Sequence, residues 1–187
     1  QETDARRLGG KSKCNPPIRP RAEGEKLWRH LAAGNVTLLS TDHVSWSLDR
    51  KTNPDMLANA SGLPGLEAMV PLFIKGALER GVSLTWAARL MALNPARHFR
   101  IDHVKGALEV GKHADIAVLT AEEHVFDASK TGNNVVGWSP YDGMTLPYKV
   151  AGTYLRGALA YDGSTVLAQP GTGRFVRPPA NLSLQDF

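Results

Sequence analysis

Asp42 and His43 end an apolar run and are the residues best placed for chemistry. The run "VTLLSTDH" is too short for a helix and is bounded by turn-forming residues, so it predicts a buried β-strand. In parallel α/β folds reactive groups sit at the carboxyl ends of strands, where a carboxylate can bind a divalent metal or act as a base. The alternative is that Asp42 accepts hydrogen bonds from turn N–H groups, and one strand alone favours this plainer interpretation.

The histidines do not complete a metal site by themselves. Adjacent strand residues point to opposite faces, so Asp42 and His43 are not expected to bind one metal, and His43 is expected to make a supporting hydrogen bond. The other histidines form no HxH or HxxxH pair and are expected to be mostly exposed: His30, His98, His103, His113 and His124. Cys14 has no second thiol beside it and is expected to be structural.

Helical elements are expected in the first hundred residues. The spacing of apolar side chains predicts helices over residues 22–35, 66–81 and 83–99. Gly34 suits the end of the first helix, and Ser83 can cap the third. Pro71 implies a kink or a later start in the second helix, and Pro95 implies a break near Asn94. With the strand before Asp42, this order suggests parallel α/β units.

After residue 100 the pattern becomes that of β-strands. Residues 106–123 and 149–167 each predict a hairpin, with a Gly-Lys turn in the first. Residues 47–65, between the strand predicted before Asp42 and the helix predicted from residue 66, form a long polar connection rich in glycine and proline, and long loops in compact domains are often functional. The two glycines of "NASGLPGLE" let backbone approach a ligand, or simply allow a tight entry to the next helix.

Composition excludes several classes of protein. Of the 187 residues 42% are hydrophobic and 21% charged, which is typical of a soluble globular protein. The net charge of +4 comes from scattered cations, so no nucleic-acid partner is expected. No apolar run reaches the roughly 18 residues of a membrane span, and the first residues do not form a signal peptide. One cysteine fits a reducing compartment, so a cytoplasmic protein is expected.

Six stretches in order resemble one known family. They are "KCNPPIRP", "LLSTDH", "ASGLPGLE", "NPARHF", "KGALEVGKHADIAVL" and "SPYDGM". Together they are similar to the C-terminal portion of the cyclic amidohydrolases, which include the dihydroorotases, allantoinases, hydantoinases and dihydropyrimidinases. The resemblance runs from about residue 8 to residue 165. Each motif is weak alone, and their common order makes the resemblance specific.

The resemblance implies an α/β fold made of a C-terminal fragment of a metal-dependent (β/α)8 barrel plus part of a small β-sandwich. Residues 1–100 would be the last strands and helices of the barrel, and residues 101–187 the sandwich portion and tail. Family members hydrolyse a ring amide with two divalent metals, usually zinc. In this chain Asp42 matches the aspartate that contacts one metal and acts as the base. Asn15, Ser61 and Gly62 match substrate-facing positions, where contacts are often made by backbone groups.

Position 46 separates the possible substrates. Dihydroorotases usually read "DHAPH", and the last histidine recognises the substrate carboxylate. Trp46 stands there in this chain, and a neutral aromatic ring cannot pair with a carboxylate but can pack on an apolar or planar group. A hydantoin-like or allantoin-like ring is therefore favoured over dihydroorotate. Asn15 stands where hydantoinases often carry serine, which leaves the substrate open.

The rest of the family's metal site has no match in this chain. The resemblance places an HxH pair, a carboxylated lysine and two histidines upstream, and a closed barrel needs at least about 200 residues. We therefore expect a fragment that works with the remainder of the barrel and is inactive alone. The alternative is a non-catalytic relative that keeps the scaffold for assembly. Family members commonly form dimers or tetramers, so a homo-oligomer with exposed apolar surface is expected.

Overall fold

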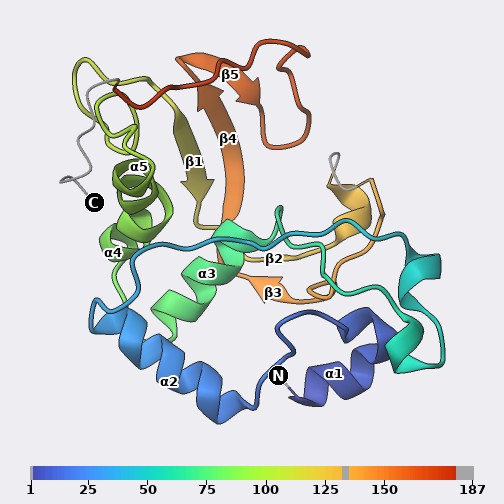
Figure 1. Ribbon diagram of the computed structural model, residues 1–187. Helices are drawn as coiled ribbons and strands as arrows, with labels where there is room; N and C mark the ends of the chain where they lie inside the picture. The colour runs from blue at the N-terminus through green and yellow to red at the C-terminus, as the bar shows by residue number, and fades with distance from the viewer. Residues whose placement is uncertain (1, 132–134, 180–187) are drawn as a thin grey trace.

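The computed structural model describes residues 2–131 and 135–179, with the α-helices before residue 100 and the strands after it (Figure 1). The α-helices are α1 (Glu2–Leu8), α2 (Arg21–Ala32), α3 (Met69–Leu78), α4 (Leu84–Ala88) and α5 (Asn94–His98). The strands are β1 (Ile116–Thr120), β2 (His124–Val125), β3 (Thr145–Leu146), β4 (Lys149–Leu155) and β5 (Ala158–Tyr161). Short 3₁₀ turns cover Gly9–Ser12, Leu48–Lys51, Met56–Ala58 and Ala128–Lys130. Within the described residues, no helix has the length and apolar character needed to cross a membrane.

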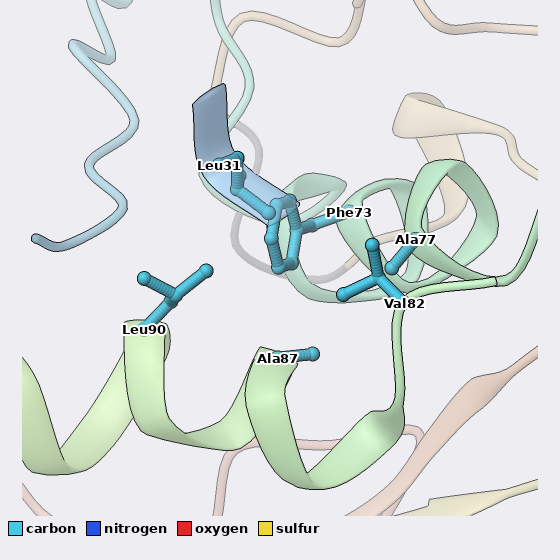
Figure 2. Close-up of a cluster of buried hydrophobic side chains, with 6 residues drawn as sticks. All are labelled: Leu31, Phe73, Ala77, Val82, Ala87 and Leu90. Atoms are coloured by element: carbon cyan, nitrogen blue, oxygen red, sulfur yellow. The ribbon is translucent and has the colours of Figure 1, made fainter. Parts of the chain in front are cut away.

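The helices pack around one buried apolar cluster, made of Leu31, Phe73, Ala77, Val82, Ala87 and Leu90. Figure 2 shows these side chains converging from α2, α3 and the helical segment that follows it. Trp28 on α2 stacks on Phe73 with ring centroids 5.4 Å apart. Gly76 permits that approach, because a Cβ there would lie 2.5 Å from the indole. This apolar burial, which stabilises by about 25 cal/mol per Å², holds α2 against α3 and α4.

The ends of the helices follow local sequence signals. Gly34, with a φ of 82°, lies just beyond the end of α2, as expected for a residue that must turn out of a helix. Ser83 caps α4, and its Oγ accepts a hydrogen bond from the Trp86 N–H at 3.2 Å. The second predicted helix starts late, at Met69, so Pro71 lies in its first turn, where its missing N–H leaves no hydrogen bond unmade.

The helix predicted over residues 83–99 runs without a gap from Leu84 to His98, but it is not α-helical throughout. A π-helical turn, Arg89–Leu93, separates α4 from α5. The Asn94 N–H bonds back to the carbonyl of Arg89, one residue before Pro95, which has no N–H to offer. The break expected near Asn94 is therefore a change from α-helical to π-helical hydrogen bonding within one helix. Such changes are found where a proline interrupts the regular hydrogen bonds of a helix.

The strands form a three-stranded antiparallel sheet in the order β1-β4-β5 and a two-stranded sheet of β2 and β3. Figure 1 shows the larger sheet at the opposite end of the molecule from α1 and α2. The hairpin predicted over 149–167 is confirmed, and Arg156 and Gly157 turn it with φ values of 49° and 82°, as a type I′ turn requires. The hairpin predicted over 106–123 is wrong, because only β1 forms there and it pairs with the distant β4. Leu108, expected in the missing arm, is 79% exposed.

The strand predicted before Asp42 is also wrong as a paired strand. Residues 36–42 have no regular secondary structure, and they form no ladder with any described residue. The Leu39 N–H donates to the Leu90 carbonyl at 3.1 Å, and the Asn94 side chain donates to the Thr37 carbonyl at 2.7 Å. A β-strand is stabilised by backbone hydrogen bonds to a neighbouring strand. In the described part of the chain, this segment bonds to a helical turn instead.

A second apolar cluster joins the helical part to the smaller sheet. It consists of Ala68, Phe126, Ala128 and Leu146, with the partly buried Leu72, Tyr141 and Met144 packed on it. Ala68 comes just before α3, while the other three buried residues come from around β2 and β3. The loops between these elements, rather than the elements themselves, carry the candidate site.

Candidate active site

Asp42 is exposed and has an unusual backbone conformation. Its φ is 45°, in the left-handed region that few residues other than glycine, asparagine and aspartate enter. Among the described residues none donates a hydrogen bond to its carboxylate, and the neighbouring His43 N–H donates to the Thr41 hydroxyl at 3.2 Å. Strained backbone of this kind concentrates at functional sites. The next residue, His43, forms a parallel bridge with Leu63, which places Asp42 beside the loop that contains Ser61 and Gly62.

His43 makes the supporting hydrogen bonds expected of it. Its Nδ1 accepts from the N–H groups of Gly65 at 3.0 Å and Leu66 at 3.1 Å. Its Nε2 lies 2.9 Å from the hydroxyl of Ser45. Two N–H donors at Nδ1 assign the neutral tautomer with the proton on Nε2. The imidazole therefore ties the segment after Asp42 to the chain leading into α3.

Trp46 lies against the same loop. Its indole N–H donates to the Ser61 carbonyl at 2.8 Å, and its own carbonyl accepts from the buried Trp138 indole at 2.8 Å. The Arg50 guanidinium sits over its ring at 5.0 Å from the centroid. The structure therefore brings together three of the predicted site positions, 46, 61 and 62, from segments well separated in the sequence.

The loop that carries Asn15 joins the same region through backbone. Asn15 itself is exposed and precedes a cis peptide bond to Pro16. Two residues earlier, the Lys13 carbonyl accepts a hydrogen bond from the Gly62 N–H at 3.0 Å. The predicted substrate-facing positions thus lie on two loops that are bonded to each other, with Asp42 at their side.

Lys51 joins these two loops and was missed by the sequence analysis. Its side chain is completely buried, at 0% exposure. Its ammonium donates to the carbonyls of Lys13 at 2.7 Å, Ala60 at 2.8 Å and Gly62 at 3.0 Å. Burial lowers the pKa of this ammonium from its usual value, and nearby charge at Cys14 acts in the opposite direction. A lone lysine in a polar connection carries no signal of burial, so no pattern could have found it.

Asn59 shapes the same connection and was also missed as a site residue. It is 3% exposed, and its amide nitrogen donates to the carbonyls of Asn53 and Asp55, at 2.9 Å each. Its Oδ1 accepts from the Asn53 N–H at 2.9 Å. With every polar atom used, Asn59 fixes a tight turn immediately before Ser61.

The residues of the "SPYDGM" stretch make hydrogen bonds that hold the loop after Gly62. The buried Ser139 hydroxyl donates to the Pro64 carbonyl at 3.2 Å. Asp142 accepts from the Ser139 N–H and the Ala128 N–H, both at 2.8 Å. These bonds attach the second apolar cluster to the loop that follows Gly62.

These residues do not form a metal site by themselves. In the described part of the chain no group of three or more histidine, cysteine, aspartate or glutamate side chains is close enough to hold a metal ion. A zinc site takes three or four protein ligands. Asp42 could contribute one oxygen, and the other ligands would have to come from residues outside this group.

This chain is similar to known proteins along most of its length. Residues 19–160 match the sequence profile described as "Amidohydrolase family". The chain belongs to the amidohydrolase family. It is 36% identical over 180 residues to an allantoinase of Rubrobacter xylanophilus, an alignment that covers 95% of this chain and 39% of that protein. It is 35% identical over 166 residues to a dihydroorotase of Pyrococcus abyssi, with 88% of this chain and 39% of that protein covered.

Solved structures of the family have the same fold as this chain. An L-hydantoinase from Arthrobacter aurescens superimposes with a TM-score of 0.89 at 30% sequence identity, covering 95% of this chain and 40% of the hydantoinase. A D-hydantoinase structure superimposes with a TM-score of 0.88, also at 30% identity. The chain spans about two-fifths of the length of the relatives it matches.

Proposed function

We propose that this chain forms one wall of the active site of a metal-dependent hydrolase of cyclic amides, with Asp42 as metal ligand and base. The observation that carries the proposal is Asp42 itself. It is exposed, it has a left-handed φ of 45°, and it stands beside a loop that is bonded in place by Lys51, His43 and Trp46. Strain at a carboxylate within a rigid frame is what a preorganised catalytic group requires.

We propose the same division of the chain that the resemblance implies. The helices and extended segment of residues 1–100 would complete a (β/α)8 barrel, and residues 101–187 would belong to a small β-sandwich. The helices before residue 100 and the antiparallel sheet of β1, β4 and β5 support this division. The remaining metal ligands, for two divalent ions such as zinc, would lie in residues outside this chain.

In this proposal each residue has a separate task. A bound divalent metal would polarise the ring carbonyl and lower the pKa of water at the site. Asp42 would take a proton from the water that adds to the ring carbonyl carbon and would deliver it to the ring nitrogen as the C–N bond breaks. Backbone groups near Asn15, Ser61 and Gly62 would orient the ring amide.

Trp46 supports a hydantoin-like or allantoin-like substrate. Its only N–H already donates to the Ser61 carbonyl, so the indole offers no donor to a substrate carboxylate and presents only a ring face or edge. The likeness to allantoinases and hydantoinases is consistent with this choice. A planar, uncharged ring substituent would fit that surface better than the carboxylate of dihydroorotate.

The experiment is the replacement of Asp42 by alanine and by asparagine in the protein as its gene encodes it. Hydrolysis of allantoin, hydantoin, dihydrouracil and dihydroorotate is measured beside metal content. We expect kcat to fall by about 10²-fold to 10⁴-fold, the usual range for a lost general base. Asp49→Ala, at another exposed aspartate in the adjacent turn, is the matched control and should keep full activity. Unchanged turnover in Asp42→Ala would remove the proposed role, and a wild-type protein without metal or turnover would support a non-catalytic scaffold.

A further inference from the structure

Lys51 is a buried cation that no acidic side chain balances within the described residues. Its ammonium has three N–H donors, and all three are used on the main-chain carbonyls of Lys13, Ala60 and Gly62. Burying a charge is unfavourable unless polar groups compensate it. Three convergent carbonyl dipoles provide that compensation here, so the interaction holds only while the two loops keep their present arrangement.

The positions of the three carbonyls carry the inference. Ala60 and Gly62 flank Ser61, and Lys13 lies two residues before Asn15. Lys51 takes the carbonyls of Ala60 and Gly62, and the Trp46 indole takes the carbonyl of Ser61 between them. Three consecutive carbonyls are therefore held by side-chain donors, which sets the orientation of the peptide units at Ser61 and Gly62.

The Gly62 N–H completes the connection. It donates to the Lys13 carbonyl at 3.0 Å, the same oxygen that accepts from Lys51 at 2.7 Å. Both lone pairs of that oxygen are thus used to join the Asn15 loop to the Ser61 loop. An apolar side chain at position 51 would leave the carbonyls of Ala60 and Gly62 without this donor, and the Lys13 carbonyl with the Gly62 N–H alone.

We propose that Lys51 is a positioning residue for the substrate: its ammonium fixes the backbone of the Asn15 and Ser61 loops in the orientation that faces the ring amide, without touching the ring. This inference rests on the proposed function, because it assumes that these loops contact the substrate. It differs from the proposal for Asp42 in that it predicts a loss of binding rather than a loss of chemistry.

The test uses Lys51→Met in the protein as its gene encodes it, with Lys105→Met as the matched control. Lys105 is a lysine with a partly buried side chain, and it pairs with Asp115 near the larger sheet rather than with carbonyls of the two loops. Amide hydrogen exchange is followed by mass spectrometry on peptides that contain residues 13–15 and 60–62. Steady-state kinetics are measured on whichever cyclic amide the wild-type protein hydrolyses.

Lys51→Met is expected to lose protection in both peptides and to raise KM by about tenfold or more, with a smaller change in kcat, as expected when uniform binding is lost. Lys105→Met should leave both quantities unchanged. Lys51→Gln keeps two N–H donors on a shorter side chain, so its exchange and its KM should lie between those of the wild type and of Lys51→Met. If Lys51→Met does not fold, these two measurements on Lys51→Gln test the proposal.

Wild-type exchange and wild-type KM in a folded Lys51→Met would overturn the proposal, and so would an equal rise of KM in Lys105→Met. If the wild-type protein hydrolyses no cyclic amide, the proposed function fails. The exchange of the 13–15 and 60–62 peptides still shows in that case whether Lys51 orders the two loops. Unchanged exchange then refutes the positioning role on its own.

Discussion

Gly62 should tolerate no side chain, although the change to alanine adds a single methyl group. Its φ is 127°, a conformation that residues with a Cβ rarely adopt. A Cβ at this position would lie 2.6 Å from Cβ of Val44 and 2.8 Å from its Cγ2, well inside the 3.5–4.0 Å of a normal carbon contact. Val44 cannot retreat freely, because its N–H donates to the Leu63 carbonyl at 3.0 Å.

The magnitude follows from two separate effects. Strained backbone at a disfavoured φ costs about 1–3 kcal/mol, and overpacking by a methyl group costs about 1–3 kcal/mol more. Gly62→Ala should therefore lower the free energy of unfolding by about 2–6 kcal/mol. Gly24→Ala is the matched control: Gly24 lies within α2, where a new Cβ would meet nothing within 4 Å. There alanine should raise stability by about 0.5–1 kcal/mol, because it is the better helix former.

Urea unfolding of both variants beside the wild type measures the two free energies directly. The same chemical change should move the midpoint in opposite directions at the two sites. A Gly62→Ala variant within about 0.5 kcal/mol of wild type, the usual scatter of harmless surface changes, would refute the argument. It would mean that the Gly62 backbone and the Val44 side chain are less tightly packed than described.

Two further predictions concern the helical part. Leu90→Ala, at a fully buried position of the first apolar cluster, should lower the free energy of unfolding, measured in urea, by about 2–5 kcal/mol. A decrease of less than about 0.5 kcal/mol, the size usual for surface substitutions, would contradict the packing described for Leu90. Arg80 donates hydrogen bonds to Glu25 at 3.0 Å and 2.6 Å, and these hold the pKa of the Glu25 carboxyl below its ordinary 4.5. The stability they contribute is present above pH 4.5 and is lost as the pH falls through the lowered folded-state pKa. In thermal unfolding, Glu25→Gln should therefore make the melting temperature less dependent on pH in that acid range. Its dependence on pH near neutrality should not change.

Local signals in the sequence predicted local features well. Ser83 and Gly34 predicted a helix start and a helix end, because capping depends only on groups within one turn. The hairpin over residues 149–167 was also predicted, because its two arms lie next to each other in the sequence. Strand pairing was predicted poorly. β1 pairs with β4 rather than with the residues just before it, and the segment before Asp42 lies against a helical turn. Pairing joins residues far apart in sequence, so periodicity within a window does not reveal the partner.

For the site, the sequence determined which chemical groups are present and in what order. It identified the family from six ordered motifs, pointed to Asp42 as the one carboxylate with a reason to be reactive, and set Trp46 where a carboxylate-binding histidine would be expected. The roles of Asp42, Asn15, Ser61 and Gly62 remain predictions. These inferences needed only residue types and spacing, because they concern what each side chain can do rather than what surrounds it.

The tertiary structure alone decided that Lys51 is buried. Its ammonium reaches carbonyls 38, 9 and 11 residues away in sequence, and no local pattern encodes such distances. A lysine in a polar connection is expected in water, since removing its charge from solvent is unfavourable. Only when the chain folds do three carbonyls converge to replace that water, and the same convergence holds the two loops of the candidate site together.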